Sequence, residues 1–170
     1  GNMNLYAYGK EENQKWIIVD TGVSFADDSI PGIDLIYPDP GFIIDKKEDL
    51  LGIVLTHAHE DHIGAISHVW PDLKCKIYAT PFTAVLISEK FKEKKIDITQ
   101  YLKIVQLNGK IKLGPFDIEF VTLTHSILEP NGLSIKTPAG TILHTGDWKI
   151  DPNPLIGDKI NEKKLRELGQ

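Results

Sequence analysis

The pattern of apolar and polar positions divides the chain into three parts, and the first is rich in strand-forming residues. Residues 4–8 (NLYAY) and 15–22 (KWIIVDTG) flank the polar residues 9–14, which predicts a β-hairpin with a long turn. Residues 21–50 are rich in glycine, proline and aspartate, so we expect mainly an irregular loop there.

The middle part alternates between strands and helices. Residues 51–56 (LGIVLT) form a continuous apolar run of strand length, which indicates a strand buried on both faces. The next residues place apolar side chains on one helical face, and Pro71 follows that pattern. Those side chains are Ile63, Ile66, Val69 and Trp70. Residues 75–80 (CKIYAT) predict another strand, and residues 81–95 predict a helix with Pro81 in its first turn.

The last part consists of short runs punctuated by glycine, proline or asparagine, which are typical of consecutive strands. These runs are residues 101–107, 110–114, 116–125, 132–138 and 140–147. Residues 160–169 (INEKKLRELG) predict a final helix that ends at Gly169. Strands, then β-α-β-α, then strands and a helix favour an α+β fold, in which sheets pack against helices.

Composition narrows the class of protein without identifying it. A chain of 170 residues is long enough for one domain with a core, and its net charge of −5 excludes a free-standing basic nucleic-acid-binding module. Cys75 is the single cysteine, so an intrachain disulfide is excluded and we expect a reducing, cytoplasmic location. No apolar run approaches the roughly 20 residues of a membrane span, so we expect no membrane partner.

Candidate metal ligands are concentrated in residues 55–65 (LTHAHEDHIGA), at the end of the predicted buried strand. His57 and His59 point the same way in an extended chain, because side chains repeat every second residue, so they can hold one ion together. Asp61 and His62 lie at the turn into the next helix and can reach a second position nearby. Mixed imidazole and carboxylate ligands suit zinc and tolerate manganese or iron.

The wording of several segments resembles one superfamily. HAHEDH resembles the HxHxDH signature of the metallo-β-lactamase superfamily, and IIVDTG, THS and HTGDWK resemble its other motifs in the expected order. THAHEDHIGAI, IYATPFT, VTLTHSI and TILHTGDWKIDPNP are similar to ribonuclease J, a member of the β-CASP nuclease branch. The resemblance covers nearly the whole chain, and it implies the αβ/βα sandwich of that superfamily.

The resemblance also implies a dinuclear zinc site, in which manganese is an acceptable substitute. Its expected ligands are His57, His59 and His125 for the first ion, Asp61 and His62 for the second, and Asp147 bridging both. Asp61, His62 and Asp147 are also the expected catalytic residues, because a hydroxide shared by the ions would attack phosphorus. Asp20 is expected to orient a ligand histidine by hydrogen bonding, although a plain turn residue is the alternative.

Other polar residues have simpler interpretations. His144 precedes Asp147 but is not a ligand position of the family, so a structural or nearby polar role is expected. His68 falls on the polar side of its predicted helix and is expected to be solvated. The lysines of the second predicted helix are interrupted by Glu93, which favours a solvated helix end over an RNA contact. They are Lys90, Lys92, Lys94 and Lys95.

The resemblance implies a metal-dependent hydrolase that cuts RNA phosphodiester bonds, either internally or from the 5′ end. RNA is therefore the expected partner, and DNA is not. One alternative is a folded metal-binding fragment with little catalysis of its own. Another is a hydrolase of the same fold that acts on a thioester, as in glyoxalase II, or on a lactam, but the motifs match those enzymes less well.

The resemblance further implies that residues 1–170 are only the first part of a metallo-β-lactamase domain. The C-terminal part of that fold and the inserted β-CASP domain are expected to be absent. The family supplies one more histidine to the second metal from far downstream, whereas the last histidine here is His144. We therefore expect an incomplete second metal position, and the sequence does not distinguish an engineered fragment from a proteolysed one or a split gene product.

An incomplete sandwich leaves a sheet edge and apolar surface uncovered, and such surfaces promote association. We therefore expect a homo-oligomer whose sedimentation coefficient rises with protein concentration in analytical ultracentrifugation. Monomeric sedimentation at every concentration would contradict this expectation.

Overall fold

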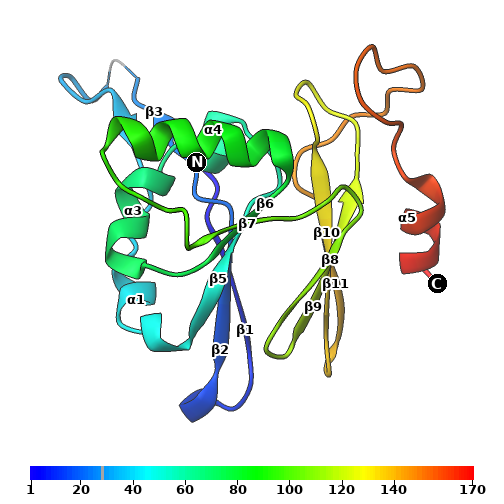
Figure 1. Ribbon diagram of the computed structural model, residues 1–170, viewed down its shortest axis with the longest axis horizontal. Coiled ribbons are helices and arrows are strands. Elements are labelled where there is room, and N and C mark those ends of the chain that lie inside the picture. The colour runs from blue at the N-terminus through cyan, green and yellow to red at the C-terminus, as the bar shows by residue number, and fades with distance from the viewer. Residues whose placement is uncertain (28) are drawn as a thin grey trace.

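The computed structural model describes residues 1–27 and 29–170 and shows two β-sheets packed face to face (Figure 1). The first sheet has five strands in the order β1-β2-β5-β6-β7. Its strands are β1 (Asn4–Tyr8), β2 (Lys15–Val19), β5 (Leu50–Val54), β6 (Ile77–Ala79) and β7 (Leu102–Ile104). The second sheet has four strands in the order β11-β10-β9-β8. These are β8 (Lys110–Leu113), β9 (Phe116–Thr122), β10 (Asn131–Thr137) and β11 (Gly140–His144).

The two sheets differ in strand direction. β1 and β2 pair as the predicted antiparallel hairpin, with a short 3-10 turn, η1 (Glu11–Asn13), between them. From β2 onward the first sheet is parallel, which is typical of β-α-β connections. The second sheet is antiparallel throughout, as expected for short consecutive strands. The expected α+β class is confirmed.

Residues 21–27 and 29–50 form mainly irregular structure, as predicted, with four short elements among these described residues; the predicted loop also includes residue 28, which lies outside them. These are β3 (Ser24–Phe25), β4 (Leu35–Ile36), α1 (Gly41–Ile44) and the 3-10 turn η2 (Lys47–Asp49). β3 and β4 pair with each other as a separate two-stranded ribbon. This long connection carries the chain from the end of β2 back to the start of β5.

The helix predicted over residues 62–70 is two short helices, α2 (Glu60–Ile63) and α3 (Ile66–Leu73). The expectation that Pro71 follows the helix is wrong, because Pro71 lies inside α3. Leu73 is buried, and the indole nitrogen of Trp70 donates to the Cys75 carbonyl at 2.7 Å, so packing carries the helix past the proline. Proline removes one helical hydrogen bond, and these contacts offset that loss.

The remaining helices match their predictions closely. α4 (Pro81–Glu93) begins at Pro81, and α5 (Glu162–Leu168) ends at Gly169. Figure 1 shows α1, α3 and α4 on the outer face of the first sheet and α5 beyond the second sheet. An ion pair of 2.7 Å between Lys164 and Glu119 joins α5 to β9. Across residues 1–27 and 29–170, no helix has the length and apolar character needed to cross a membrane.

Alternation along the central strands builds two cores. Ile18 and Ile53 belong to the cluster beneath the helices, whereas Ile17, Val19 and Val54 belong to the cluster between the sheets. All of these side chains are fully buried, so β2 and β5 are covered on both faces. The predicted burial is therefore confirmed for residues 52–56, whereas Leu51 is half-buried. A strand buried in this way delivers the residues that follow it to a fixed place at the edge of the sandwich.

Large apolar side chains nevertheless remain on the surface. Phe25 is 70% exposed and Ile150 is 78% exposed, and Ile142 and Leu143 on the edge strand β11 are about 40% exposed. Such surface is what the expectation of self-association requires. The association itself stays a prediction.

Replacing Phe120 tests the core between the sheets. Phe120 is fully buried on β9, so Phe120→Ala should lower the free energy of unfolding by about 3–5 kcal/mol. The loss is measured from the midpoint and slope of urea unfolding. The control is Ile142→Ala, at a position 44% exposed, which should cost less than about 1 kcal/mol. Equal losses for the two variants would contradict the assignment of this core.

Candidate metal centre

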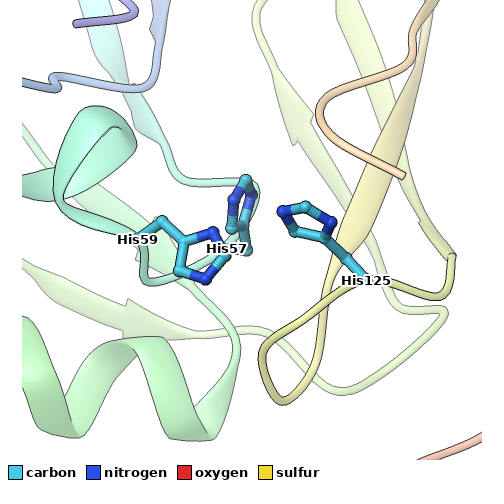
Figure 2. A group of neighbouring side chains, drawn as sticks. All are labelled: His57, His59 and His125. Atoms are coloured by element: carbon cyan, nitrogen blue, oxygen red, sulfur yellow. The ribbon is translucent and has the colours of Figure 1, made fainter. Parts of the chain in front are cut away.

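Three histidines converge where the ends of the two sheets meet (Figure 2). His57 and His59 follow β5, and His125 follows β9. The ring centroids lie 4.9 Å apart for His57 and His59, 5.2 Å for His57 and His125, and 4.9 Å for His59 and His125. One ring nitrogen from each falls within 4.8 Å of the others, which is a spacing that one metal ion can bridge. The structure thus brings together the three residues predicted for the first metal.

A second group adjoins the first and shares His57 with it. His57, His62 and Asp147 each place one ligand atom within 4.8 Å of the others. A carboxylate oxygen of Asp147, Oδ2, lies 3.4 Å from Nε2 of His62 and 3.6 Å from Nε2 of His125. Asp147 therefore lies between the two groups, where the sequence prediction places a bridging ligand.

Asp61 lies at the side of this second group. Its Oδ2 atom is 3.5 Å from Nε2 of His62, and half of its side-chain surface is exposed. Among the described residues, the two groups of three contain every predicted ligand except Asp61. The second group therefore has His57 where the sequence prediction had Asp61.

Asp20 is a buried carboxylate beside the histidines. Its Oδ1 accepts from the backbone N–H of Thr56 at 2.8 Å, and its Oδ2 accepts from the Thr56 hydroxyl at 2.8 Å. Oδ2 also lies 2.8 Å from Nδ1 of His62. A carboxylate only accepts, so Nδ1 of His62 carries a hydrogen, and in the neutral ring Nε2 keeps its lone pair. Asp20 thereby orients His62 towards Asp147, which is the kind of role predicted for it.

Thr56 extends the same control to His57. The single hydroxyl hydrogen of Thr56 goes to Asp20, so the hydroxyl oxygen accepts from Nδ1 of His57 at 3.0 Å. Nε2 of His57 is then the atom with the free lone pair. Among the described residues, this buried nitrogen has no hydrogen-bond partner. A buried polar atom of this kind needs a partner, and a metal ion suits a neutral imidazole.

Burial controls the charge of the rings. Burial first, and then the neighbouring rings of His62, His59 and His125, together lower the pKa of His57 to about 3. Burial also lowers the pKa of His125. For His62, burial lowers the pKa, but the hydrogen bond and charge of Asp20 outweigh it and raise the pKa overall. His57 and His125 are therefore neutral near pH 7, which is the form that binds metal.

Hydrogen bonds between the two sheets fix the position of the histidines relative to one another. The backbone N–H and the side-chain amide of Asn131 both donate to the carbonyl of Thr56, each at 3.2 Å. Asn131 begins β10, so this contact ties the loop after His125 to the residue before His57. Asn131 and Thr56 are not predictable from the sequence, because their contact joins segments 75 residues apart and leaves no local signal.

An open cleft of about 540 Å³ lies beside His125. Its walls are mainly apolar and come from the start of α4, the loop after β9, and residues 154–158. Glu129, in that loop, accepts from the backbone N–H of Phe82 at 2.8 Å and so ties the loop to α4. The cleft gives a substrate room to reach the histidine cluster from one side.

The other polar candidates lie outside both groups. His144 contacts the hydroxyl of Tyr6 at 2.9 Å, which fits the structural role expected of it. His68 is exposed and stacks on Tyr37 with 5.2 Å between ring centroids. Lys90 departs from the expected solvated helix end, because it forms an ion pair of 2.6 Å with Glu60 and only 23% of its side chain is exposed.

Comparisons with known proteins identify the family of the chain. A family model described as the beta-lactamase superfamily domain matches residues 15–165. The chain is 42% identical to ribonuclease J of Sinorhizobium meliloti over 171 residues, covering 99% of this chain and 30% of that protein. It is also 42% identical to ribonuclease J of Helicobacter pylori over 171 residues, covering 100% of this chain and 24% of that protein.

A solved structure supports the fold independently. The metallo-beta-lactamase fold protein YhfI from Bacillus subtilis matches with a TM-score of 0.58 at 18% identity, covering 88% of this chain and 56% of that chain. Identity this low shows the fold alone. The chain spans less than a third of the two ribonuclease J proteins and a little over half of YhfI. It belongs to the metallo-β-lactamase superfamily, has part of that superfamily's αβ/βα fold, and is similar to ribonuclease J along its whole length.

Proposed function

We propose that this chain carries the metal centre of a metal-dependent hydrolase that cuts RNA phosphodiester bonds. The main observation behind this proposal is that His57, His59 and His125 lie within reach of one ion. The buried Nε2 of His57 has no hydrogen-bond partner among the described residues, and Asp147 lies beside the group. The 42% identity to two ribonuclease J proteins supports RNA as the substrate class.

Zinc fits the donor set, because neutral imidazoles and carboxylates are its usual ligands, and manganese is acceptable to the same set. In this proposal, His57, His59 and His125 hold the first ion. Asp61 and His62 belong to the second, and Asp147 lies between them. When bound, zinc lowers the pKa of a water molecule and stabilises negative charge on phosphoryl oxygens.

The residues of the chain itself supply orientation. Asp20 and Thr56 aim Nε2 of His62 and of His57 into the centre, and burial keeps His57 unprotonated at neutral pH. The carboxylate of Asp147, 3.4 Å and 3.6 Å from two ring nitrogens, can accept a hydrogen bond from a water molecule there and orient it. The cleft beside His125 is the approach that we assign to the scissile phosphate.

Net charge of −5 means that the protein surface as a whole does not attract a polyanion. Binding of the phosphate backbone therefore depends on the metal ions, or on parts of the longer relatives that this chain does not match. For the same reason a folded metal-binding fragment with little catalysis is the second candidate. The second group supports this second candidate. Among the described residues it consists of His62, Asp147 and the shared His57, with no further histidine.

Two further assignments belong to the same proposal. A cytoplasmic location fits the single cysteine, Cys75, which is buried and whose pKa is raised to about 12 by burial. A thiol of that kind is a packing residue and not a reactive one. Homo-oligomerisation through the exposed apolar surface remains our expectation for the isolated chain.

Metal analysis tests the centre directly. Each purified chain should retain one tightly held zinc ion after dialysis, because only the first group has three histidines. His57→Ala and His125→Ala should each release that ion, as measured by elemental analysis. His68→Ala is the matched control, at an exposed histidine outside both groups, and should leave the zinc content unchanged. Two tightly held ions per chain would contradict the incomplete second position, and none would contradict the centre itself.

A labelled-RNA cleavage assay with added zinc or manganese tests the activity. Cleavage should appear with the unaltered chain and fall to background with His59→Ala, which removes a ring from the first group. Cleavage that survives this change comes from a contaminating nuclease. Metal binding without cleavage would support the fragment alternative. Hydrolysis of a thioester or a chromogenic lactam, without RNA cleavage, would favour a different hydrolase of the same fold.

A further inference from the structure

The side chain of Asn2 lies against the second metal position. Its amide nitrogen Nδ2 is 3.1 Å from the carbonyl oxygen of Asp61, 3.3 Å from Oδ2 of Asp61, and 3.1 Å from Nε2 of His62. Asn2 therefore contacts both residues that we assign to the second ion alone, although it is 59 residues from Asp61 in sequence.

The neighbours of the amide determine which way it faces. The carbonyl oxygen and Oδ2 of Asp61 both accept hydrogen bonds, so the NH₂ group of Asn2, which has two hydrogens to donate, must point towards them. In the neutral ring, which is the form that binds metal, Nε2 of His62 is also an acceptor, because Nδ1 donates to Asp20. A reversed amide would place its oxygen against three acceptors.

Asp61 depends on this contact for its orientation. Half of its side-chain surface is exposed, and among the described residues Asn2 is the side chain that donates a hydrogen bond to its carboxylate. An exposed carboxylate without a partner is free to rotate, and a metal ion that binds it must offset the loss of that freedom. The amide of Asn2 reduces this cost before the ion arrives.

We propose that Asn2 is a positioning residue for the second ion, holding the carboxylate of Asp61 beside Nε2 of His62. This inference rests on the proposed metal centre and deepens it. Residues that hydrogen-bond to metal ligands raise affinity by fixing ligand orientation, so the side chain of Asn2 should act selectively on the second ion.

The main chain of Asn2 has a separate, structural role. Its N–H donates to the Asp61 carbonyl at 2.7 Å, and its carbonyl accepts from the N–H of Gly22 at 2.7 Å. These contacts do not involve the side chain, so they persist when the side chain is replaced. Side-chain variants therefore separate positioning of Asp61 from anchoring of the chain.

Cobalt(II) titration followed by calorimetry provides the test, because cobalt prefers similar ligands and each equivalent bound gives its own heat. Asn2→Leu keeps the size of the side chain and removes its hydrogen bonds. The affinity for the second equivalent of cobalt should fall about 10- to 100-fold, and the affinity for the first should stay within about twofold. Asn2→Ala should do the same, and Asn153→Leu, at an exposed asparagine, should change neither equivalent. Circular dichroism establishes that each variant is folded.

A double-mutant cycle gives the readout that a merely structural role would not produce. In the background of Asp61→Ala, the further change Asn2→Leu should have little additional effect on the second equivalent, because its target is gone. Equal binding by Asn2→Leu and the unaltered chain overturns the inference and leaves the proposed centre intact. Equal weakening of both equivalents, unfolding of both Asn2 variants, or absence of a second equivalent in the unaltered chain also overturns it. Absence of any bound cobalt contradicts the proposed centre as well.

Discussion

The buried carboxylate of Asp20 is the constraint on which the arrangement of the histidines depends. A charge with no exposure to solvent must be satisfied by hydrogen bonds, and Asp20 accepts them from Thr56 and His62. In the neutral rings these bonds place the hydrogen of each histidine on Nδ1. Nε2 of His57 then has a free lone pair, and Nε2 of His62 faces the amide of Asn2. Asp20 does this from a left-handed backbone conformation, with φ at 63°, which is costly for a residue other than glycine.

Close approach of backbone segments completes the centre. Gly22 follows Asp20 and Thr21, and a Cβ atom there would lie 1.6 Å from the carbonyl oxygen of Asp61. Gly146 precedes Asp147 with φ at 56°, and a Cβ atom there would lie 3.0 Å from the carbonyl oxygen of Asn131. The DTG and TGD segments therefore each need their glycine for a steric reason. Together they allow the segment after β2 and the loop carrying Asp147 to reach the histidine cluster.

The centre lies where the two large sheets meet. The parallel sheet supplies His57, His59 and His62, and the antiparallel sheet supplies His125 and the loop to Asp147. The apolar cluster between the sheets fixes their separation, and the contact between Asn131 and Thr56 fixes their register at the site. Ligand geometry in this fold thus depends on packing far from the ligands, because a shift of one sheet would separate the histidines.

Local patterns were sufficient for the strands of the two large sheets, for helices α4 and α5, and for the HAHEDH cluster, because each depends on residues close in sequence. They did not predict the short strands β3 and β4. Resemblance added His125 and Asp147 as predicted ligands. Only tertiary packing explains why α3 continues beyond Pro71 and why Lys90 pairs with Glu60. The same holds for the hydrogen bonds of Asn131 with Thr56 and of Asn2 with Asp61. These contacts join segments far apart in the chain, and a hydrogen bond between distant residues imposes no periodicity on the sequence of either one.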